Sequence, residues 1–426
     1  MVNEVTDPMR TGYLVPLVAI AFASTAWPQG DPLGAEFRVN TYTTNSQRFP
    51  SVAADPSGNF VVVWTSYTQD GSSSGVFGQR YASSGLPLGP EFRVNTHTTS
   101  FQERPSVVSD PSGSFVVVWS SDGQDGASFG IFGQRYDSAG APVGPEFRVN
   151  TYTPDAQVDP SVASDSLGNF VVVWESRKPV FKTSHGIFGQ RYSSTGAPLG
   201  PEFRVNTYSA NFTFRSAVAA DSAGNFVVAW TRSGGYASTP PDVFAQRYAS
   251  TGAPLGPEFR VNTLEFGYQQ RPSVASDSSG NFVVAWDTGP TPAPWNIAAQ
   301  RFADTGEPLG PEFRVNTNQV GDKRSPSVAS DSAGNFVVTW ESEYQDGNLE
   351  GVFGKRYGSA GEPLGPEFRV NTQTSSAEVD PSVAADASGR FVVVWQSFIK
   401  DGSSYGIFAQ RFGPIVPVEL MEFGLE

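Results

Sequence analysis

The sequence predicts an all-β protein: a seven-bladed β-propeller of four-stranded antiparallel blades, closed by the N-terminal strand completing the last blade. A unit of about 55 residues recurs seven times along the chain, and each unit holds four strand-like segments. Four strands in a repeat of roughly this length are typical of a propeller blade. The phase in which the repeat starts and stops predicts that the ring is closed.

Two strings define the repeat. Phe-Val-Val-X-Trp ends at Trp64, Trp119, Trp174, Trp230, Trp286, Trp340 and Trp395. Glu-Phe-Arg-Val-Asn recurs at intervals of 54 to 56 residues and begins at Glu36, Glu91, Glu146, Glu202, Glu258, Glu312 and Glu367. Such regularity over nearly the whole chain indicates one structural unit per repeat.

The four segments of the first unit each suit one position in a blade. Residues 50–55 are small and suit the innermost strand, where blades converge. Residues 60–64 are apolar on both faces, as expected of a strand buried between neighbouring blades. Residues 76–81 and 91–96 alternate in polarity, so each should have one better-buried face. Gly- and Pro-rich turns separate the segments and leave no room for a helix.

The phase of the repeat predicts closure. The chain opens on a fourth-type segment at 36–41, runs through six complete units, and ends on the third segment of a seventh unit at Phe412. The first segment can therefore complete the last blade, which hides the edges that an open array exposes. The tail over 413–426 contains a second apolar segment that competes for this position. An open solenoid with polar caps is the alternative architecture.

The N-terminus resembles an export signal. Arg10 precedes an apolar run over 13–23, which at about 11 residues is too short to span a bilayer, since that takes ~20. Small residues at Ser24 and Ala26 favour cleavage after residue 26, and Met9 is an alternative start; a buried N-terminal segment is the other interpretation. We therefore expect a signal peptide over 1–26, a propeller over 32–412, a tail over 413–426, and a secreted, extracellular or cell-surface protein.

Composition limits the classes of partner. The net charge of −14 makes polyanions poor partners, and no basic stripe points to nucleic acid. Cysteine is absent, so disulfides and thiolate chemistry are excluded. We expect a monomer that binds no nucleic acid and has no membrane span.

The stretch from Pro272 to Trp286 resembles the first hairpin of NHL-type propeller repeats, with an apolar strand, an Asp-X-X-Gly-Asn turn and a second apolar strand. The whole unit also resembles the near-identical repeats of large secreted bacterial proteins. The resemblance covers residues 32–412 and implies a blade. NHL-like lyases use metal-binding histidines, whereas this chain has only His97 and His185, both in variable segments, so no metal site is expected.

Residues repeated in every unit are better suited to structure than to chemistry. The repeated aspartates are expected to cap their own turns, with calcium binding as the alternative: Asp55, Asp110, Asp165, Asp221, Asp277, Asp331 and Asp386. Arg80 and Glu91, with their counterparts, are expected to form cross-strand charge pairs, with an anion site as the functional alternative. No catalytic set stands out, and no cofactor is expected.

The segments that differ between units are the candidate binding surface. They join the fourth segment to the next first one and the second to the third, so both kinds emerge at one end of the ring; relaxed constraint on surface loops is the alternative explanation. Binding sites favour such loops, and the candidate residues are Tyr42, Arg48, Phe181, His185, Tyr208, Phe212, Arg215, Tyr236, Phe266, Tyr268 and Trp295. We expect a non-catalytic binding or scaffolding protein that recognises a protein or glycan. The alternatives are a carbohydrate-active enzyme with its site over the central channel and a purely structural surface or matrix repeat.

Overall fold

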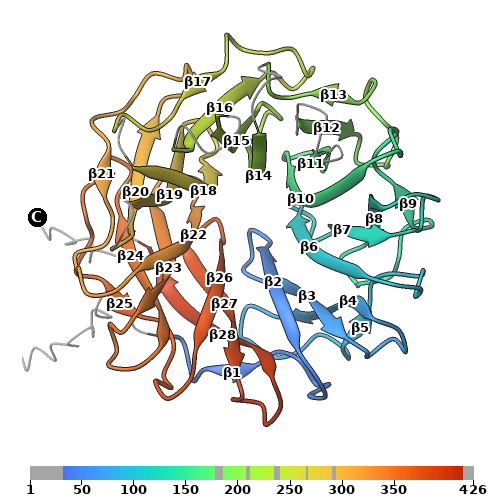
Figure 1. The fold of residues 1–426 in the computed structure, drawn as a ribbon, viewed down its shortest axis with the longest axis horizontal. Coiled ribbons are helices and arrows are strands. Elements are labelled where there is room, and N and C mark those ends of the chain that lie inside the picture. The colour runs from blue at the N-terminus through green and yellow to red at the C-terminus, as the bar shows by residue number, and fades with distance from the viewer. Residues whose placement is uncertain are drawn as a thin grey trace, which may run out of the picture.

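The fold was examined in a computed structural model, which describes residues 32–415 except 178–185, 208–211, 235–239, 265–266 and 290–293. The described residues form 28 β-strands in seven four-stranded sheets, arranged as blades around a central axis (Figure 1). The predicted seven-bladed propeller is confirmed. No helix long and apolar enough to cross a membrane occurs in the described part of the chain.

Each blade is an antiparallel sheet whose strands follow chain order from the axis outward. The innermost strands of blades 1 to 7 are β2 (Gln47–Ala54), β6 (Gln102–Ser109), β10 (Ala156–Ser164), β14 (Phe212–Ala220), β18 (Tyr268–Ser276), β22 (Lys323–Ser330) and β26 (Glu378–Ala385). The second strands are β3 (Phe60–Tyr67), β7 (Phe115–Asp122), β11 (Phe170–Arg177), β15 (Phe226–Ser233), β19 (Phe282–Gly289), β23 (Phe336–Glu343) and β27 (Arg390–Phe398).

The third strands are β4 (Ser74–Tyr81), β8 (Phe129–Tyr136), β12 (Gly186–Tyr192), β16 (Asp242–Tyr248), β20 (Asn296–Phe302), β24 (Glu350–Tyr357) and β28 (Tyr405–Pro414). The outermost strands of blades 1 to 6 are β5 (Phe92–Arg93), β9 (Phe147–Arg148), β13 (Phe203–Arg204), β17 (Phe259–Arg260), β21 (Phe313–Arg314) and β25 (Phe368–Arg369). The outermost strand of blade 7 is β1 (Phe37–Arg38), from the other end of the chain.

Ring closure follows the phase of the repeat. β1 pairs antiparallel with β28, with Phe37 opposite Ala409, and the Glu36 carboxylate forms an ion pair with Lys400 of blade 7. β1 thus holds the outermost position of blade 7, and the last described residue of the tail, Ile415, is buried and its amide donates to the carbonyl of Gly389. The N-terminal strand therefore closes the ring, as predicted.

The outermost strands are shorter than the six-residue segments that alternation predicts. In blade 1 the side-chain oxygen of Asn95 accepts a hydrogen bond from the amide of Val76 at 2.7 Å, and its Nδ2 donates to the carbonyl of His97. The side chain thus takes the ladder position of a backbone carbonyl, and the backbone ladder ends with the bond from the Val94 amide to the Val76 carbonyl, one residue after β5. The Asn that ends each Glu-Phe-Arg-Val-Asn string is therefore a strand terminator.

The core lies between blades. All seven tryptophans of the second strands have no exposed surface, as the apolar strand pattern predicts. Trp119 of blade 2, for example, belongs to one buried cluster with Val61 and Val63 of blade 1. Each blade therefore depends on its neighbour for half of its core.

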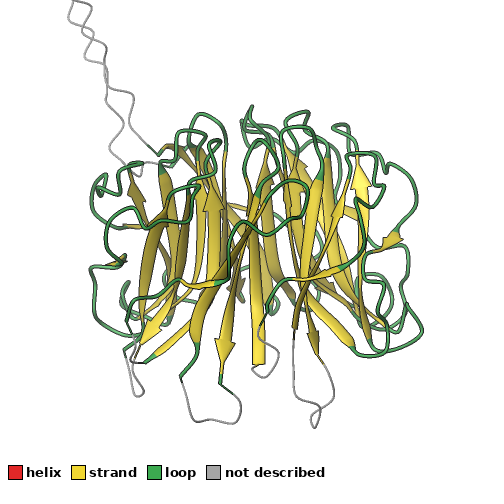
Figure 2. Cartoon of the chain, turned by 90° about the horizontal axis from the view of Figure 1, so that it is seen from above, coloured by secondary structure: helices red, strands yellow, loops and turns green. Residues whose placement is uncertain are grey.

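The two ends of the ring differ (Figure 2). Because the strands are antiparallel, the connections between first and second strands and between third and fourth strands lie at one end, which we call the uniform face. The connections between second and third strands and between blades lie at the other end, the variable face. Each end of the central channel has a hollow.

Candidate functional site

The repeated aspartates of the uniform face hold their own turns together. Asp55 Oδ1 accepts hydrogen bonds from the amides of Ser57 and Asn59, at 2.8 and 3.0 Å, and its Oδ2 accepts from Asn59 Nδ2 at 2.8 Å. The same amide bonds recur at Asp165, Asp221 and Asp331, among others. Within the described residues, no group of three or more acidic or histidine side chains could hold a metal ion. The turn-capping prediction is confirmed.

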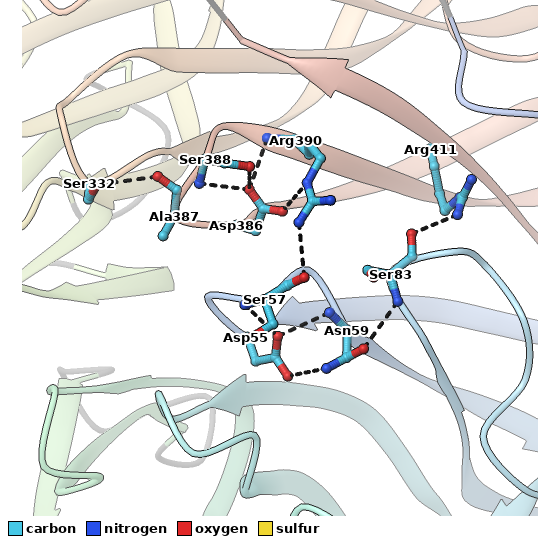
Figure 3. Close-up of polar contacts among 10 residues, drawn as sticks. All are labelled: Asp55, Ser57, Asn59, Ser83, Ser332, Asp386, Ala387, Ser388, Arg390 and Arg411. Carbon is cyan, nitrogen blue, oxygen red and sulfur yellow. Dashed lines mark hydrogen bonds and ion pairs between the residues drawn. The ribbon is translucent and has the colours of Figure 1, made fainter.

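The corresponding turn of blade 7 has a different residue and lies where blades 7 and 1 meet, which we call the closing seam (Figure 3). Arg390 stands where Asn59 stands in blade 1, and its Nε donates to Asp386 Oδ2 at 2.7 Å while its Nη2 donates to the carbonyl of Ser57 in blade 1. Arg411 adds a second bond across the seam, to the carbonyl of Ser83. The uniform face thus serves to join blades.

The expected pairing of Arg80 with Glu91 is wrong. Arg80 donates to the carbonyls of Ser138 and Ala139 in the next blade, and Glu91 accepts from the amide and hydroxyl of Thr41 in the preceding blade. Both side chains lie at blade interfaces. Each therefore binds groups of a neighbouring blade instead of the other side chain of the expected pair.

The candidate site is a cavity of about 1010 Å³ where the central channel opens on the variable face. We call it the channel mouth. The innermost strand of every blade contributes one residue to its ring: Phe49, Arg104, Asp159, Arg215, Arg271, Ser325 and Asp380. The residue that directly follows each ring residue is proline, except that Ser216 follows Arg215.

A strained backbone presents these ring residues. All seven have a positive φ of 51 to 56°, at a β-bulge that interrupts the pairing of the innermost strand with the second. Left-handed backbone is costly for a residue with a side chain, at roughly 1–3 kcal/mol, and neighbouring structure must hold it in place. In blade 2, the amide of Arg104 donates to Thr65 Oγ1 of blade 1 at 3.0 Å. The ring is therefore a built feature of the blade interfaces.

The charge of the residues that line the mouth is opposite in sign to the net charge of the molecule. Four arginines line it, namely Arg104, Arg177, Arg215 and Arg271. The carboxyl groups that line it are three, those of Asp159, Glu175 and Asp380. The whole chain, by contrast, has 28 basic and 42 acidic residues. Phe49, Phe212 and Phe214 add aromatic surface. The expectation that polyanions are poor partners, which rests on net charge, does not describe this end of the channel.

The basic side chains of the mouth fall into two groups. Asp159 receives Arg104 at 3.3 Å and Arg177 at 3.1 Å, and Arg177 also pairs with Glu175 at 2.9 Å. Arg215 is exposed at the mouth and has no hydrogen-bond or ion-pair partner among the described residues. Desolvation and the positive charge of Arg271 lower the pKa of Arg215, yet an arginine stays protonated. Arg215 therefore feels the charges of Asp287 and Asp159, but no carboxylate of the described residues forms an ion pair with it.

Two carboxyl groups beside the mouth retain protons more readily than usual. Burial raises the pKa of Asp380, whose Oδ2 accepts a hydrogen bond from Gln396 Nε2 at 2.9 Å. Burial, and then the charge of Asp380, raise the pKa of Glu341, whose Oε2 accepts from the amide of Asp380 at 3.1 Å. In both carboxyl groups, burial therefore favours the protonated form, which is the form that a general acid needs.

The structure brings together only part of the predicted binding set. Phe212 and Arg215 line the mouth. Arg48 lies over the Tyr405 ring at 4.4 Å, and the rings of Tyr268 and Trp295 lie 5.8 Å apart. Tyr42 is half-buried, and its carbonyl accepts from Asn40 Nδ2. The remaining predicted residues lie outside the described residues: Phe181, His185, Tyr208, Tyr236 and Phe266.

Sequence reasoning missed most of the ring, because its members stand inside strands rather than in loops. One signal was present: the residue before the repeated Pro-Ser-Val string varies among Phe, Arg, Asp and Ser, although the string itself changes only in the fourth unit, to Ser-Ala-Val. Arg104, Asp159, Arg271 and Asp380 are the charged residues that this variation would have found.

No protein-family model matches the sequence, and the search of curated proteins returned no match. The NHL resemblance therefore holds for the propeller architecture alone. Solved structures of other proteins share the fold. A polysaccharide lyase of family PL25, an ulvan lyase, is 11% identical with a TM-score of 0.58, covering 89% of this chain and 96% of that one.

The polysaccharide lyase Uly1 is 8% identical with a TM-score of 0.54, covering 92% of this chain and 94% of that one. A protein of unknown function from Dyadobacter fermentans is 11% identical with a TM-score of 0.51, covering 88% and 97%. At these identities the likeness is one of fold, and the propeller fold is thus shared with polysaccharide-degrading enzymes.

Proposed function

We propose that this protein is carbohydrate-active and takes an acidic polysaccharide at the channel mouth. The observation that carries the proposal is Arg215, a guanidinium at the mouth without a partner among the described residues, beside Arg271. A guanidinium binds carboxylate and sulfate groups with paired hydrogen bonds. The mouth also offers Phe212 and Phe214, whose rings can pack against the apolar face of a sugar.

Two further features support a polysaccharide. The cavity is at the upper end of the ~300–1,000 Å³ usual for small-molecule sites, and it opens to solvent at a face rather than enclosing its contents. Two proteins with this fold are polysaccharide lyases, so a polysaccharide is the first ligand class to test.

Binding is tested by calorimetry with oligogalacturonate, a polyuronate, and with an oligosaccharide sulfate. The neutral control is the methyl ester of the same oligogalacturonate, which keeps the chain and removes its charge. Arg215→Gln should weaken binding of the acidic ligand about tenfold or more, because a hydrogen bond to a charged group is worth ~1.5–3 kcal/mol. Arg93→Gln, an exposed arginine on the outermost strand β5, should leave it unchanged.

Equal affinity for the acid and its methyl ester would contradict the proposal, as would an Arg215→Gln variant that binds like the parent. Failure of both acidic ligands to bind would contradict it too.

Cleavage of the bound polysaccharide is a second candidate function, favoured by Asp380. Its carboxyl group lines the mouth and has a raised pKa, as a general acid that protonates a glycosidic oxygen needs. Asp380→Asn should then abolish release of new sugar ends while binding persists. An unchanged rate in this variant would exclude Asp380 as the acid.

A further inference from the structure

The residue after each buried tryptophan normally joins two blades. These residues are Thr65, Ser120, Glu175, Thr231, Asp287, Glu341 and Gln396. In five of the blade interfaces among the described residues, this side chain accepts a hydrogen bond of 3.0 to 3.2 Å from the amide of the ring residue in the next blade. The bond holds the left-handed ring residue in place.

Asp287 departs from this pattern. Its side chain is fully buried between blades 5 and 6, and neither carboxyl oxygen has a hydrogen-bond partner among the described residues. Leaving a buried polar group unpaired costs stability, so such a group calls for an explanation. The nearest cation is Arg271 of the mouth, with its Nη1 3.5 Å from Asp287 Oδ2.

The groups facing Asp287 come from four strands. Arg271 on β18 is the strongest, followed by Glu341 on β23, Arg215 on β14 and Arg324 on β22. Burial outweighs the arginines and raises the pKa of Asp287 to about 8. At neutral pH the carboxyl group is therefore mostly uncharged, and it leaves the charge of Arg271 uncompensated.

Arg271 is only weakly engaged elsewhere. Its Nη1 donates to Ser325 Oγ at a long 3.4 Å, and its side chain is partly exposed at the mouth. By contrast, Arg104 forms an ion pair with Asp159, and Arg177 forms one with Glu175. Asp287 is the carboxyl group within ion-pair distance of Arg271, while the charges of Asp380 and Glu341 also act on this guanidinium.

We propose that Asp287 regulates anion binding at the mouth by controlling the charge that Arg271 presents. When Asp287 is the neutral acid, the Arg271 guanidinium can bind an anionic group of the ligand. As the carboxylate, it pairs with Arg271 and cancels that charge. This inference rests on the proposed function, since it concerns the same mouth.

The test compares the pH dependence of oligogalacturonate binding in the parent and in Asp287→Asn between pH 6 and pH 9. The ligand's carboxylates are ionised throughout this range. Parent affinity should fall about tenfold as Asp287 ionises, whereas Asp287→Asn, which has the same shape and cannot ionise, should bind equally at both pH values. Asp322→Asn is the matched control, because Asp322 pairs with Arg324 and the pKa of its carboxyl group is lowered.

Parallel pH profiles for the parent and Asp287→Asn would overturn the inference and leave the proposed function standing. A separate measurement needs no ligand: the difference in melting temperature between the two proteins should grow with pH and level off near pH 8. A difference independent of pH would show that Asp287 does not titrate in this range, and would overturn the inference even if no polysaccharide bound.

Discussion

The tryptophan within each second strand and the tryptophan in a variable segment lead to opposite predictions for stability. Trp230 has no exposed surface, so Trp230→Ala should destabilise the fold by roughly 3–5 kcal/mol through lost packing. Trp295 is half-buried, and its two backbone bonds, to Asp322 and Lys323, survive truncation. Trp295→Ala should therefore cost about 1 kcal/mol or less. Thermal or denaturant melts decide this, and equal shifts in the two variants would contradict the buried-core assignment.

Asp287 also makes a prediction about stability. Its pKa is near 3.9 in an unfolded chain and about 8 in the folded protein, so the folded state binds more protons between these values. The contribution of the neutral Asp287 carboxyl group to the free energy of unfolding is complete below about pH 4. It is lost progressively as the pH rises to about 8. Asp287→Asn should therefore gain in free energy of unfolding relative to the parent across this window. Urea melts at pH 5 and pH 8 measure the gain, and a smaller gain at pH 8 would contradict the assignment.

At the level of strands, the closing strand gives the most direct test. Deleting residues 27–41 removes β1 with the buried Val39 and Asn40, and it exposes the edge of β28. Deleting 414–426 removes the buried Ile415 and the carbonyl of Pro414 that Arg356 binds. The first deletion should lower the melting temperature by far more than the second. A larger loss from the tail deletion would give the tail the closing role.

The strands also show where sequence reasoning succeeds and where it stops. Apolar runs such as 60–64 predict buried strands because burial on both faces leaves no other pattern. The bulge in each innermost strand was not predictable, since a residue before proline normally takes extended backbone and not the left-handed form seen at Arg104. What holds that form is a contact from the preceding blade, about 40 residues away in sequence.

At the scale of the whole molecule, the ring of residues at the mouth exists only because seven strands converge. Its members are spaced one repeat apart, and their shared place before the Pro-Ser-Val string does not show that their side chains meet at one opening. The blade count and closure could be predicted because they depend on the repeat and its phase. The pairing of Asp287 with Arg271 could not, because it depends on distances across the bulged ends of neighbouring strands.

Net charge and local charge oppose each other, and this gives a kinetic prediction. The molecule carries −14, so it repels an acidic polysaccharide at long range, whereas the mouth attracts it at short range. Raising the ionic strength from 0.01 to 0.15 M shortens the Debye length from ~30 to ~8 Å and screens the long-range repulsion first. The association rate of oligogalacturonate should therefore rise with salt while its dissociation rate also rises. Stopped-flow measurements that show association slowing with salt would contradict this balance of charges.

The order in which the chain is made gives the closing strand a last consequence. A ribosome releases β1 first and β28 last, so the two partners of one sheet are separated in time by the synthesis of every other blade. Until β28 emerges, β1 has no partner and the apolar surface that blades 1 and 7 bury against each other is not fully covered, and such exposed apolar surface invites aggregation. Synthesis that halts within the seventh repeat thus yields an arc that cannot close. The cell must keep that arc apart from its neighbours until the final strand arrives.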